Sequence, residues 1–393
     1  MKIDRKIILW GADDYNILGA LRQLVPYGCD VLCLFSFPMY ECAEHSRYCK
    51  NYVAFDTHTE ALDYLLTHFQ EEKERPILSA HSDVVAELID LHKDELSKYF
   101  VISGTTEQGL LTKIQDKYEM SELAVGCGFN VPHTMPLLPD SDVSAVSLPC
   151  FVRSAINTKR TSWHKRVKCN TLQELKEVQS ELTNEDHVIV SDFIAKEYEI
   201  LVIGVRFHNG NVYIPGCYMK DRWHYGNYGS GSHGQIMPDI PKCINLDSIR
   251  KMLSEIDYYG QFSVEYGIVG EKAYFYEIYL RNDGTSDYFN QCGANTNLAW
   301  VYDCCDLDVS TLYVPVQKTA YMIHEIGDVK NIREMNIPIK EWFRQILEAE
   351  VYVYWNKHDI KPFFVMLHKV HHIERWPYRL CRKIWRKMFK ITT

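Results

Sequence analysis

The stretch "QFSVEYGIVGEKAYFYEIYLRNDGT", residues 261–285, contains two glutamates inside a predicted β-hairpin. Apolar arms on either side of a glycine favour two antiparallel strands. If residues 270–272 form an odd-length turn, Glu265 lies directly opposite Glu277 on one face. A two-residue turn would put the two carboxylates on opposite faces. The odd register also gives an apolar second face, in which Val264, Tyr266 and Ile268 oppose Ile278, Tyr276 and Tyr274.

Two opposed carboxylates repel each other unless a cation lies between them or one of them is protonated. Magnesium is a hard cation that takes one or two carboxylates together with the phosphate oxygens of a nucleotide. The pair Glu265 and Glu277 is therefore a candidate metal site. From spacing alone, two solvated glutamates on a half-exposed sheet face remain the alternative.

The composition is that of a water-soluble protein with several domains. The chain has 393 residues and a net charge of −9, which is enough length for two or three packed domains. Its 13 cysteines form no CxxC pair, which indicates free thiols in a reducing compartment. No secretory leader and no uninterrupted apolar stretch of membrane-spanning length is present, so we expect a cytoplasmic protein.

The first part of the chain, residues 1–112, alternates apolar strand patterns with helical patterns. This alternation predicts a doubly wound parallel sheet. The first turn, "WGADDYNILG", lacks the GxGxxG spacing of a dinucleotide site. A later segment, "GNYGSGSHGQ" at residues 226–235, has that spacing but precedes no helical pattern, so we interpret it as a mobile loop or lid.

Four further segments, taken in their order along the chain, resemble the motifs of a known protein family. They are "KIQDKYEMSELAVGCGFNVPHT" (113–134), "LPCFVRSA" (148–155), "VIVSDFIAKEYEI" (188–200) and the hairpin with its "YEIYLRNDGT" end. Together with the α/β start, they resemble the ATP-grasp carboxylate–amine ligases, in the branch of D-aspartate ligase and the large-chain units of carbamoyl-phosphate synthase. The resemblance covers roughly residues 1–330.

The resemblance implies an α/β chain of three parts. Residues 1–112 would be a Rossmann-like pre-ATP-grasp domain, and residues 113–330 a two-lobed α+β ATP-grasp domain whose small lobe spans about 148–195. Residues 331–393 would be a helical extension with a basic tail. The implied enzyme is an ATP-dependent ligase that forms a C–N bond and requires Mg²⁺, or Mn²⁺ in its place. It converts a small-molecule carboxylate into an acyl phosphate, which an amine then attacks to form an amide.

The resemblance also assigns residues by position. The phosphates of the nucleotide would contact Lys117, Arg153 and Lys220. The adenine would meet the backbone of Ser191, Asp192, Phe193 and Ile194, and the ribose would meet Glu197. Glu265 and Glu277 would hold the metal. Arg281 would orient the substrate or phosphate, so Arg281 and Lys220 are the candidate catalytic residues.

Two departures from the family pattern bear on activity. The phosphate-covering loop, "INTKRTSWHKRVK" at residues 156–168, has no glycine and contains the cations Lys159, Arg160, Lys165 and Lys168. Tyr279 stands where the family usually has an asparagine that ligates the metal, and a neutral phenol is a weak ligand for a hard cation. Asn282 or Asp283 could supply the missing oxygen. The alternative function is a catalytically weakened nucleotide-binding protein with the same fold.

The end of the chain is strongly basic, with eight Lys or Arg residues and one Glu between residues 368 and 393. Within "PYRLCRKIWRKMFK" (377–390), the apolar side chains recur at helical spacing and the basic ones fill the other face. This pattern favours either a helix at the inner face of an anionic membrane or a helix docked on the acidic body. A membrane role would suit a ligase of cell-envelope or glycan modification, or a membrane-associated scaffold. Because the rest of the chain is acidic, the sequence does not favour a nucleic-acid partner.

Overall fold

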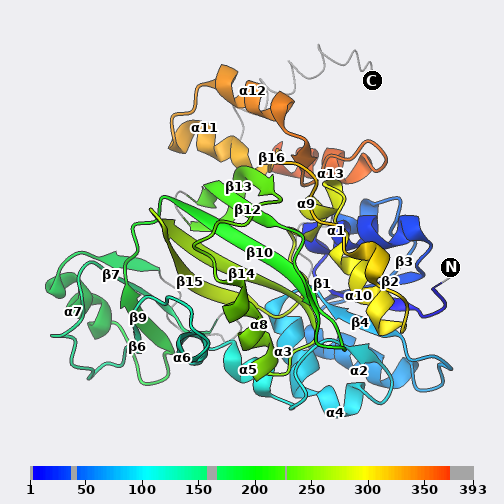
Figure 1. The fold of residues 1–393 in the computed structure, drawn as a ribbon, viewed down its shortest axis with the longest axis horizontal. Helices are drawn as coiled ribbons and strands as arrows, with labels where there is room; N and C mark the ends of the chain where they lie inside the picture. The colour runs from blue at the N-terminus through cyan, green and yellow to red at the C-terminus, as the bar shows by residue number, and fades with distance from the viewer. Residues whose placement is uncertain (1–2, 37–41, 157–165, 226–227, 372–393) are drawn as a thin grey trace.

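The computed structural model describes residues 3–36, 42–156, 166–225 and 228–371. Within them the chain folds into three β-sheets with helices packed around them (Figure 1). The predictions for Lys159, Arg160, Lys165 and the basic tail lie outside these described residues. No helix of the described residues is long and apolar enough to cross a membrane.

The N-terminal sheet is parallel, with the strand order β3-β2-β1-β4-β5, which confirms the predicted doubly wound arrangement. Its strands are β1 (Ile7–Gly11), β2 (Val31–Ser36), β3 (Asn51–Phe55), β4 (Ile77–Ala80) and β5 (Val101–Ile102). Its helices are α1 (Tyr15–Leu24), α2 (His58–His68), α3 (Asp83–Leu91) and α4 (Lys93–Leu96). The first three helices begin at capping side chains, Asp14, Thr57 and Ser82, which accept hydrogen bonds from free backbone N–H groups.

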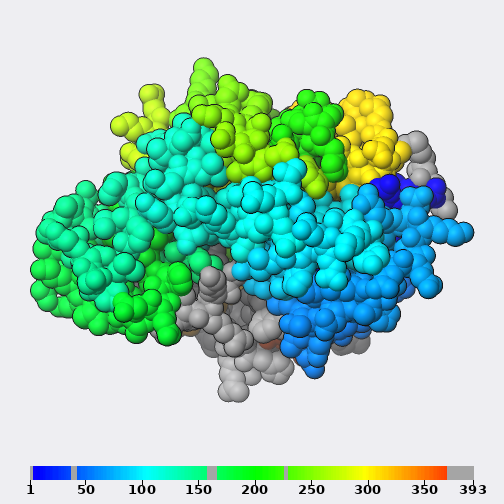
Figure 2. Space-filling view, turned by 90° about the horizontal axis from the view of Figure 1, so that it is seen from below, coloured from blue at the N-terminus to red at the C-terminus, as the bar shows by residue number. Residues whose placement is uncertain are grey.

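A small antiparallel sheet follows, with the order β6-β9-β7-β8. Its strands are β6 (Thr134–Pro136), β7 (Cys150–Ser154), β8 (Val167–Cys169) and β9 (Val188–Asp192), and α7 (Leu172–Ser180) packs on it. We call this sheet with α7 the small lobe. Helices α5 (Leu110–Ile114) and α6 (Lys117–Gly126) lead into it. The small lobe has its own hydrophobic core and stands at one end of the molecule, away from the N-terminal sheet (Figure 2).

The large sheet has the order β15-β14-β10-β12-β13-β16-β17, with β11 added beside β10. Its strands are β10 (Tyr198–Arg206), β11 (Val212–Tyr213), β12 (Cys217–Tyr225), β13 (Tyr228–Met237), β14 (Gly260–Val269), β15 (Lys272–Tyr279), β16 (Ala320–Ile323) and β17 (Val351–Tyr352). The remaining helices are α8 (Leu246–Glu255), α9 (Ser286–Gln291), α10 (Thr296–Cys304), α11 (Asn331–Glu334), α12 (Ile339–Glu348) and α13 (Lys361–His371).

The glycine-rich segment that we interpreted as a loop or lid is instead part of strand β13, so that prediction is wrong over residues 228–235. This strand pairs with β12 on one side and β16 on the other. Its glycines are required by close packing, since a Cβ at Gly234 would collide with the backbone oxygen of Met219. The glycines therefore serve sheet packing, and their GxGxxG spacing is a coincidence.

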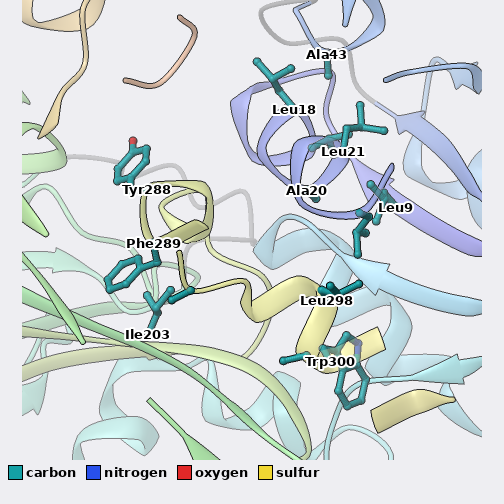
Figure 3. Close-up of a cluster of buried hydrophobic side chains, with 14 of the residues drawn as sticks. Leu9, Leu18, Ala20, Leu21, Ala43, Ile203, Tyr288, Phe289, Leu298 and Trp300 are labelled. Atoms are coloured by element: carbon teal, nitrogen blue, oxygen red, sulfur yellow. The ribbon is translucent and has the colours of Figure 1, made fainter. Parts of the chain in front are cut away.

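One hydrophobic core joins the N-terminal sheet to the large sheet. Leu18 and Leu21 of α1 lie in the same cluster as Phe289 of α9 and Trp300 of α10 (Figure 3). The segment after residue 330 belongs to this core too, because β17 extends the large sheet and Phe363 is buried in the cluster. This packing holds the carboxyl ends of β1 and β4 beside the hairpin of β14 and β15.

Candidate active site

A cavity of about 710 Å³ lies where the small lobe, the large sheet and the N-terminal sheet meet. Most of the candidate residues line it, namely Arg153, Ser191, Asp192, Phe193, Ile194, Glu197, Lys220, Glu265, Glu277 and Arg281. Side chains at the ends of N-terminal strands, which we did not predict, line the same cavity: Asp14, His81 and Asp83. The cavity is therefore the candidate active site.

The predicted pairing of Glu265 with Glu277 is confirmed, although the reason we gave for it is wrong. Val269 pairs with Lys272, so the turn has two residues and not three. A β-bulge at Tyr276 inserts one extra residue into β15 and restores the pairing of the two glutamates. A two-residue turn thus does not separate the carboxylates, because the bulge shifts the register between the turn and Glu277.

The bulge also changes the apolar face of the hairpin. Val264 opposes Ile278 as predicted, whereas Tyr266 and Ile268 oppose Phe275 and Ala273 instead of Tyr276 and Tyr274. The ring of the bulged Tyr276 crosses Gly267 so closely that any Cβ there would collide with the phenol oxygen. Because Gly267 has no side chain, the ring of the bulged Tyr276 can pack over it, beside the carboxylates.

Glu265 belongs to a buried group of charges on three neighbouring strands. Lys220 of β12 forms an ion pair with Glu265 and lies 3.5 Å from Glu199 of β10. Burial raises the pKa of Glu265 to about 7, with Glu199 adding to the rise and Lys220 opposing it. Burial would lower the pKa of Lys220, but its two carboxylate neighbours raise it. Lys220 is therefore a fixed positive charge at the floor of the cavity.

Glu277 faces a second set of cations. The ammonium group of Lys117, the first residue of α6, lies 3.7 Å from a carboxylate oxygen of Glu277. Burial alone would raise the pKa of Glu277, but Lys117, Arg153 and other donors together lower it to about 2. Among the described residues, the buried Nε of Arg153 has no hydrogen-bond partner. A buried guanidinium nitrogen without an acceptor fits an anionic ligand such as a phosphate.

Tyr279 lies between the two carboxylates. Its hydroxyl is 2.7 Å from a Glu277 oxygen and 3.4 Å from a Glu265 oxygen. Within the described part of the chain, no group of three or more His, Cys, Asp or Glu side chains is arranged to hold a metal. The two glutamates fit a magnesium ion that brings phosphate oxygens with it, and the phenol competes for the same oxygens.

Replacing Tyr279 tests this competition. In Tyr279→Asn, an amide oxygen replaces a hydroxyl that bonds both carboxylates, so we expect the Mg²⁺ concentration needed for half-maximal nucleotide stabilisation to fall about tenfold. The measurement is the melting temperature with ATP over a series of Mg²⁺ concentrations. Tyr279→Phe is the matched control, because it removes the hydroxyl without adding a ligand. An unchanged Mg²⁺ midpoint in Tyr279→Asn would show that the phenol does not compete with metal.

The structure does not bring Asn282 into the cavity, which corrects its prediction as a metal ligand. Its side chain is fully buried, and its oxygen accepts hydrogen bonds from Gln261 and Asn297. Its amide nitrogen donates to the side chain of Asn16 at 2.5 Å. Both ends of the amide are thus occupied in joining the hairpin to the N-terminal domain. Asp283 does line the cavity, although its carboxylate accepts from Ser263 and Thr285.

The segment predicted to meet adenine lies at the mouth between the small lobe and the large sheet. The N–H groups of Asp192 and Phe193 donate to His133 and Pro149, while no described residue accepts from the N–H of Ile194. The ammonium of Lys168, one of the predicted loop cations, lies 4.2 Å from the ring centre of Phe193. Ile194 is therefore the residue of this segment whose donor is available to a ligand.

Glu197, predicted to bind ribose, is exposed at the rim of the cavity. Its carboxylate accepts a hydrogen bond from the N–H of Gly270 and so fixes the hairpin turn. Two residues further along, Glu199 is buried in the cavity, where it accepts from the indole of Trp223 at 2.7 Å. Strand alternation does not distinguish the two glutamates, because residues two apart lie on the same face; Glu197 precedes β10 and is occupied by the hairpin turn.

Arg281 lies at the junction of the hairpin with the N-terminal domain. Its Nε donates to Asp83 at 2.8 Å, and its Nη1 lies 3.4 Å from Asp283. Its guanidinium also lies 4.6 Å from the ring centre of Tyr279. These contacts fix the guanidinium plane beside Tyr279, which is a suitable position for orienting an anionic substrate.

Asp14 carries a raised pKa that has a consequence for stability. Burial raises the pKa of Asp14 from 3.8 to about 7, although the hydrogen bonds from the Ile17 and Asn16 N–H groups lower it. The nearby Asp13 raises this pKa further, and Arg281 lowers it. Because the folded pKa exceeds the unfolded one, ionisation of Asp14 disfavours the folded state as the pH rises from about 4 to 7.

We therefore expect Asp14→Asn, which retains an N-capping oxygen, to be more stable than the wild type at pH 8 by roughly 2 kcal/mol. The advantage should shrink as the pH falls to 4, where Asp14 is protonated in both states. Urea unfolding of both proteins at pH 4, 6 and 8 measures this difference. A difference that does not depend on pH would contradict the raised pKa.

No family model and no curated protein matches the sequence. The fold, however, is similar to several solved structures. The L-amino acid ligase of Bacillus licheniformis aligns with a TM-score of 0.63 at 13% identity, over 82% of this chain and 80% of that one. N5-carboxyaminoimidazole ribonucleotide synthetase of Thermus thermophilus aligns with a TM-score of 0.64 at 15% identity, over 83% and 87%.

A third solved structure is the biotin carboxylase domain of a Hydrogenobacter thermophilus 2-oxoglutarate carboxylase, in complex with MgADP and bicarbonate. It aligns with a TM-score of 0.62 at 12% identity, over 80% of this chain and 73% of that one. The chain has the ATP-grasp fold. The expected fold class is thereby confirmed over most of the chain, whereas the specific resemblance to D-aspartate ligase stays a prediction.

Proposed function

We propose that the protein is an ATP-dependent ligase that activates a carboxylate as an acyl phosphate and joins it to an amine. The observation that carries the proposal is the convergence of three cations, Lys117, Arg153 and Lys220, on the Glu265–Glu277 pair in a cavity between two sheets. Solved structures of the same fold are an L-amino acid ligase and carboxyaminoimidazole synthetases in complex with ADP or ATP, which supports the same chemistry here.

The cavity fits a nucleotide along its length. At the mouth, the N–H of Ile194 offers a donor to the adenine edge, beside the Phe193 ring. Further in, the unpartnered Nε of Arg153 fits a phosphate oxygen. The ammonium of Lys220, which is paired with Glu265, is assigned to the transferred phosphate. We assign the ribose to Glu199, whose buried carboxylate lies in the cavity, in place of the exposed Glu197.

The residues of the chain can perform the work that phosphoryl transfer requires. Bound ATP would supply the phosphoryl group, and Mg²⁺ on Glu265 and Glu277 would screen its charge. Arg153 and Lys220 screen the same charge from the protein side, and the ion pair with Glu265 and burial fix Lys220 in place before the substrate binds. Arg281, held by Asp83, orients the carboxylate that is to be activated.

The test is ADP release from ATP and Mg²⁺ with pairs drawn from the common amino acids and small carboxylic acids. The proposal predicts ADP release that requires both an acid and an amine. If ATP raises the melting temperature but no pair releases ADP, the protein is instead a nucleotide-binding module of the same fold. If neither ATP nor ADP changes the melting temperature, both functions are wrong.

The nucleotide-binding module is the second candidate, and Tyr279 favours it. Its hydroxyl bonds both glutamates, at a position where the family usually supplies a metal ligand. This candidate predicts that nucleotide binds with little dependence on Mg²⁺ and without turnover. The Mg²⁺ series described for Tyr279→Asn separates the two candidates.

We also propose, from the sequence alone, that the basic tail associates with an anionic membrane surface, which would place the ligase at the inner face and suit an envelope or glycan substrate. The tail lies outside the described residues. The test is flotation with phosphatidylserine liposomes of the full chain and of a form ending at residue 375. Equal flotation of the two forms would rule out the tail as the anchor.

A further inference from the structure

The inner end of the cavity is built by the N-terminal sheet. Asp14 follows β1 and His81 follows β4, and these two strands are neighbours in the parallel sheet. The carboxyl ends of adjacent parallel strands meet at one edge, so both side chains project to the same place. Asp83, the first residue of α3, completes this group at the end of the cavity that lies beyond Tyr279 and Arg281.

One ring nitrogen of His81 has no hydrogen-bond partner among the described residues. Its side chain is only 2% exposed and lines the cavity, and its Nε2 has no partner among the described residues. The amide nitrogen of Asn16 donates to the backbone oxygens of His81 and Asn282, so the Asn16 oxygen faces the Nδ1 of His81 at 3.0 Å. The Nδ1 also lies 3.2 Å from the amide nitrogen of Asn282, so it either donates to Asn16 or accepts from Asn282, and in both tautomers the buried Nε2 is left without a partner.

His81 also remains neutral. Burial lowers its pKa to about 3, and the guanidinium of Arg281 lowers it further. The imidazole therefore presents an unpartnered nitrogen, and no positive charge, to whatever occupies this end of the cavity. A buried polar atom without a partner is costly unless a ligand supplies one.

The two carboxylates beside it also have unpartnered atoms. One oxygen of Asp14 accepts from the N–H groups at the start of α1, and one oxygen of Asp83 accepts from Arg281. No described residue donates to the second oxygen of either carboxylate. Once Asp14 is ionised, above its pKa of about 7, each carboxylate offers a free acceptor oxygen beside the neutral His81. A ligand with several N–H donors on one atom and a positive charge fits these oxygens.

We propose that Asp14, His81 and Asp83 form the subsite that binds the amine substrate, in the form of a primary ammonium group. This inference rests on the proposed ligase function and adds the location and the chemical class of the nucleophile. The position suits that role, because Asp83 bonds Arg281, whose guanidinium lies over the ring of Tyr279, and the Tyr279 hydroxyl contacts both glutamates. The subsite therefore adjoins the proposed reaction centre.

The experiment separates amine binding from nucleotide binding. Wild-type protein saturated with ADP is titrated by calorimetry with ethylammonium chloride and with each common amino acid, and the amine that binds is then titrated into the variants. Asp14→Asn removes one charge. His81→Asn retains a polar group near the Nδ1 position but deletes the Nε2 atom, whereas His81→Gln places a polar group near the Nε2 position. Asp63→Asn, exposed on α2, is the matched control.

We expect Asp14→Asn and His81→Asn each to weaken amine binding at least tenfold, while ADP binding changes less than twofold. His81→Gln should recover part of the loss, and Asp63→Asn should behave as the wild type. If no amine binds a protein that binds ADP, or if both variants bind the amine as tightly as the wild type does, the subsite is wrong while a nucleotide site stands. If ADP does not bind to the wild type, the proposed function itself is wrong.

Discussion

Lys220→Met is expected to lower the free energy of unfolding by about 3–5 kcal/mol. Among the described residues, Lys220 is the only ion-pair partner of Glu265 and one of two cations near Glu199, and all three side chains are buried. Removing the ammonium leaves Glu265 in the protein interior without its counter-charge, so Glu265 must take up a proton or pull in water. Urea unfolding at pH 7.5 measures the loss.

Two controls separate this effect from general damage. The double variant Lys220→Met with Glu265→Gln removes both charges of the pair and should recover part of the lost stability. Lys318→Met removes a lysine whose ion pair with Glu350 is exposed, and we expect it to leave the unfolding midpoint unchanged. If Lys220→Met were as stable as the wild type, the buried charge group would not be formed as the structure places it.

Glu277→Gln is expected to reduce the rate of acid- and amine-dependent ADP formation by a factor on the order of 10²–10³. The carboxylate is held ionised, with a pKa of about 2, and it is opposed across the hairpin by Glu265. The glutamine amide has nearly the same shape as the glutamate carboxylate, but it carries no charge. It therefore cannot neutralise a magnesium ion that is shared with the phosphates. The rate under saturating ATP and Mg²⁺ is the measurement.

Glu271→Gln is the matched control for Glu277→Gln, since Glu271 is exposed in the turn of the same hairpin. Its rate should equal that of the wild type. Unfolding curves of Glu277→Gln are needed as well, because Lys117 loses its carboxylate neighbour. A folded Glu277→Gln protein that forms ADP at the wild-type rate would contradict the assignment of Glu277 to the reaction centre.

The hairpin shows what sequence could and could not predict. The facing of Glu265 and Glu277 was predicted from an odd-length turn and an apolar second face; the apolar face exists, but the turn has two residues. The bulge at Tyr276 was not predictable from periodicity, because a bulge adds one residue at a point that alternation alone does not reveal. Gly267, which makes room for the bulged ring, was a local signal in the sequence that we did not use.

The roles of side chains that join the domains were harder to predict from the sequence. Asn282 follows the hairpin directly and looked like a metal ligand, yet its partners Asn16 and Asn297 are distant in sequence. Likewise, His81 and Asp14 reach the cavity only because the core around α1 docks the N-terminal sheet on the large sheet. The strand pattern predicted each domain, but only the tertiary packing determines which strand ends meet at the site.

The measurement that tests the account most directly is an equilibrium titration of ATP, in the presence of Mg²⁺, into wild-type protein and into Arg153→Met. The account predicts one ATP bound per chain, and a Kd at least tenfold weaker in the variant, because the unpartnered guanidinium nitrogen of Arg153 is assigned to a phosphate. Equal affinity in the two proteins, or no binding to the wild type, would contradict the assignment of the cavity as an ATP site.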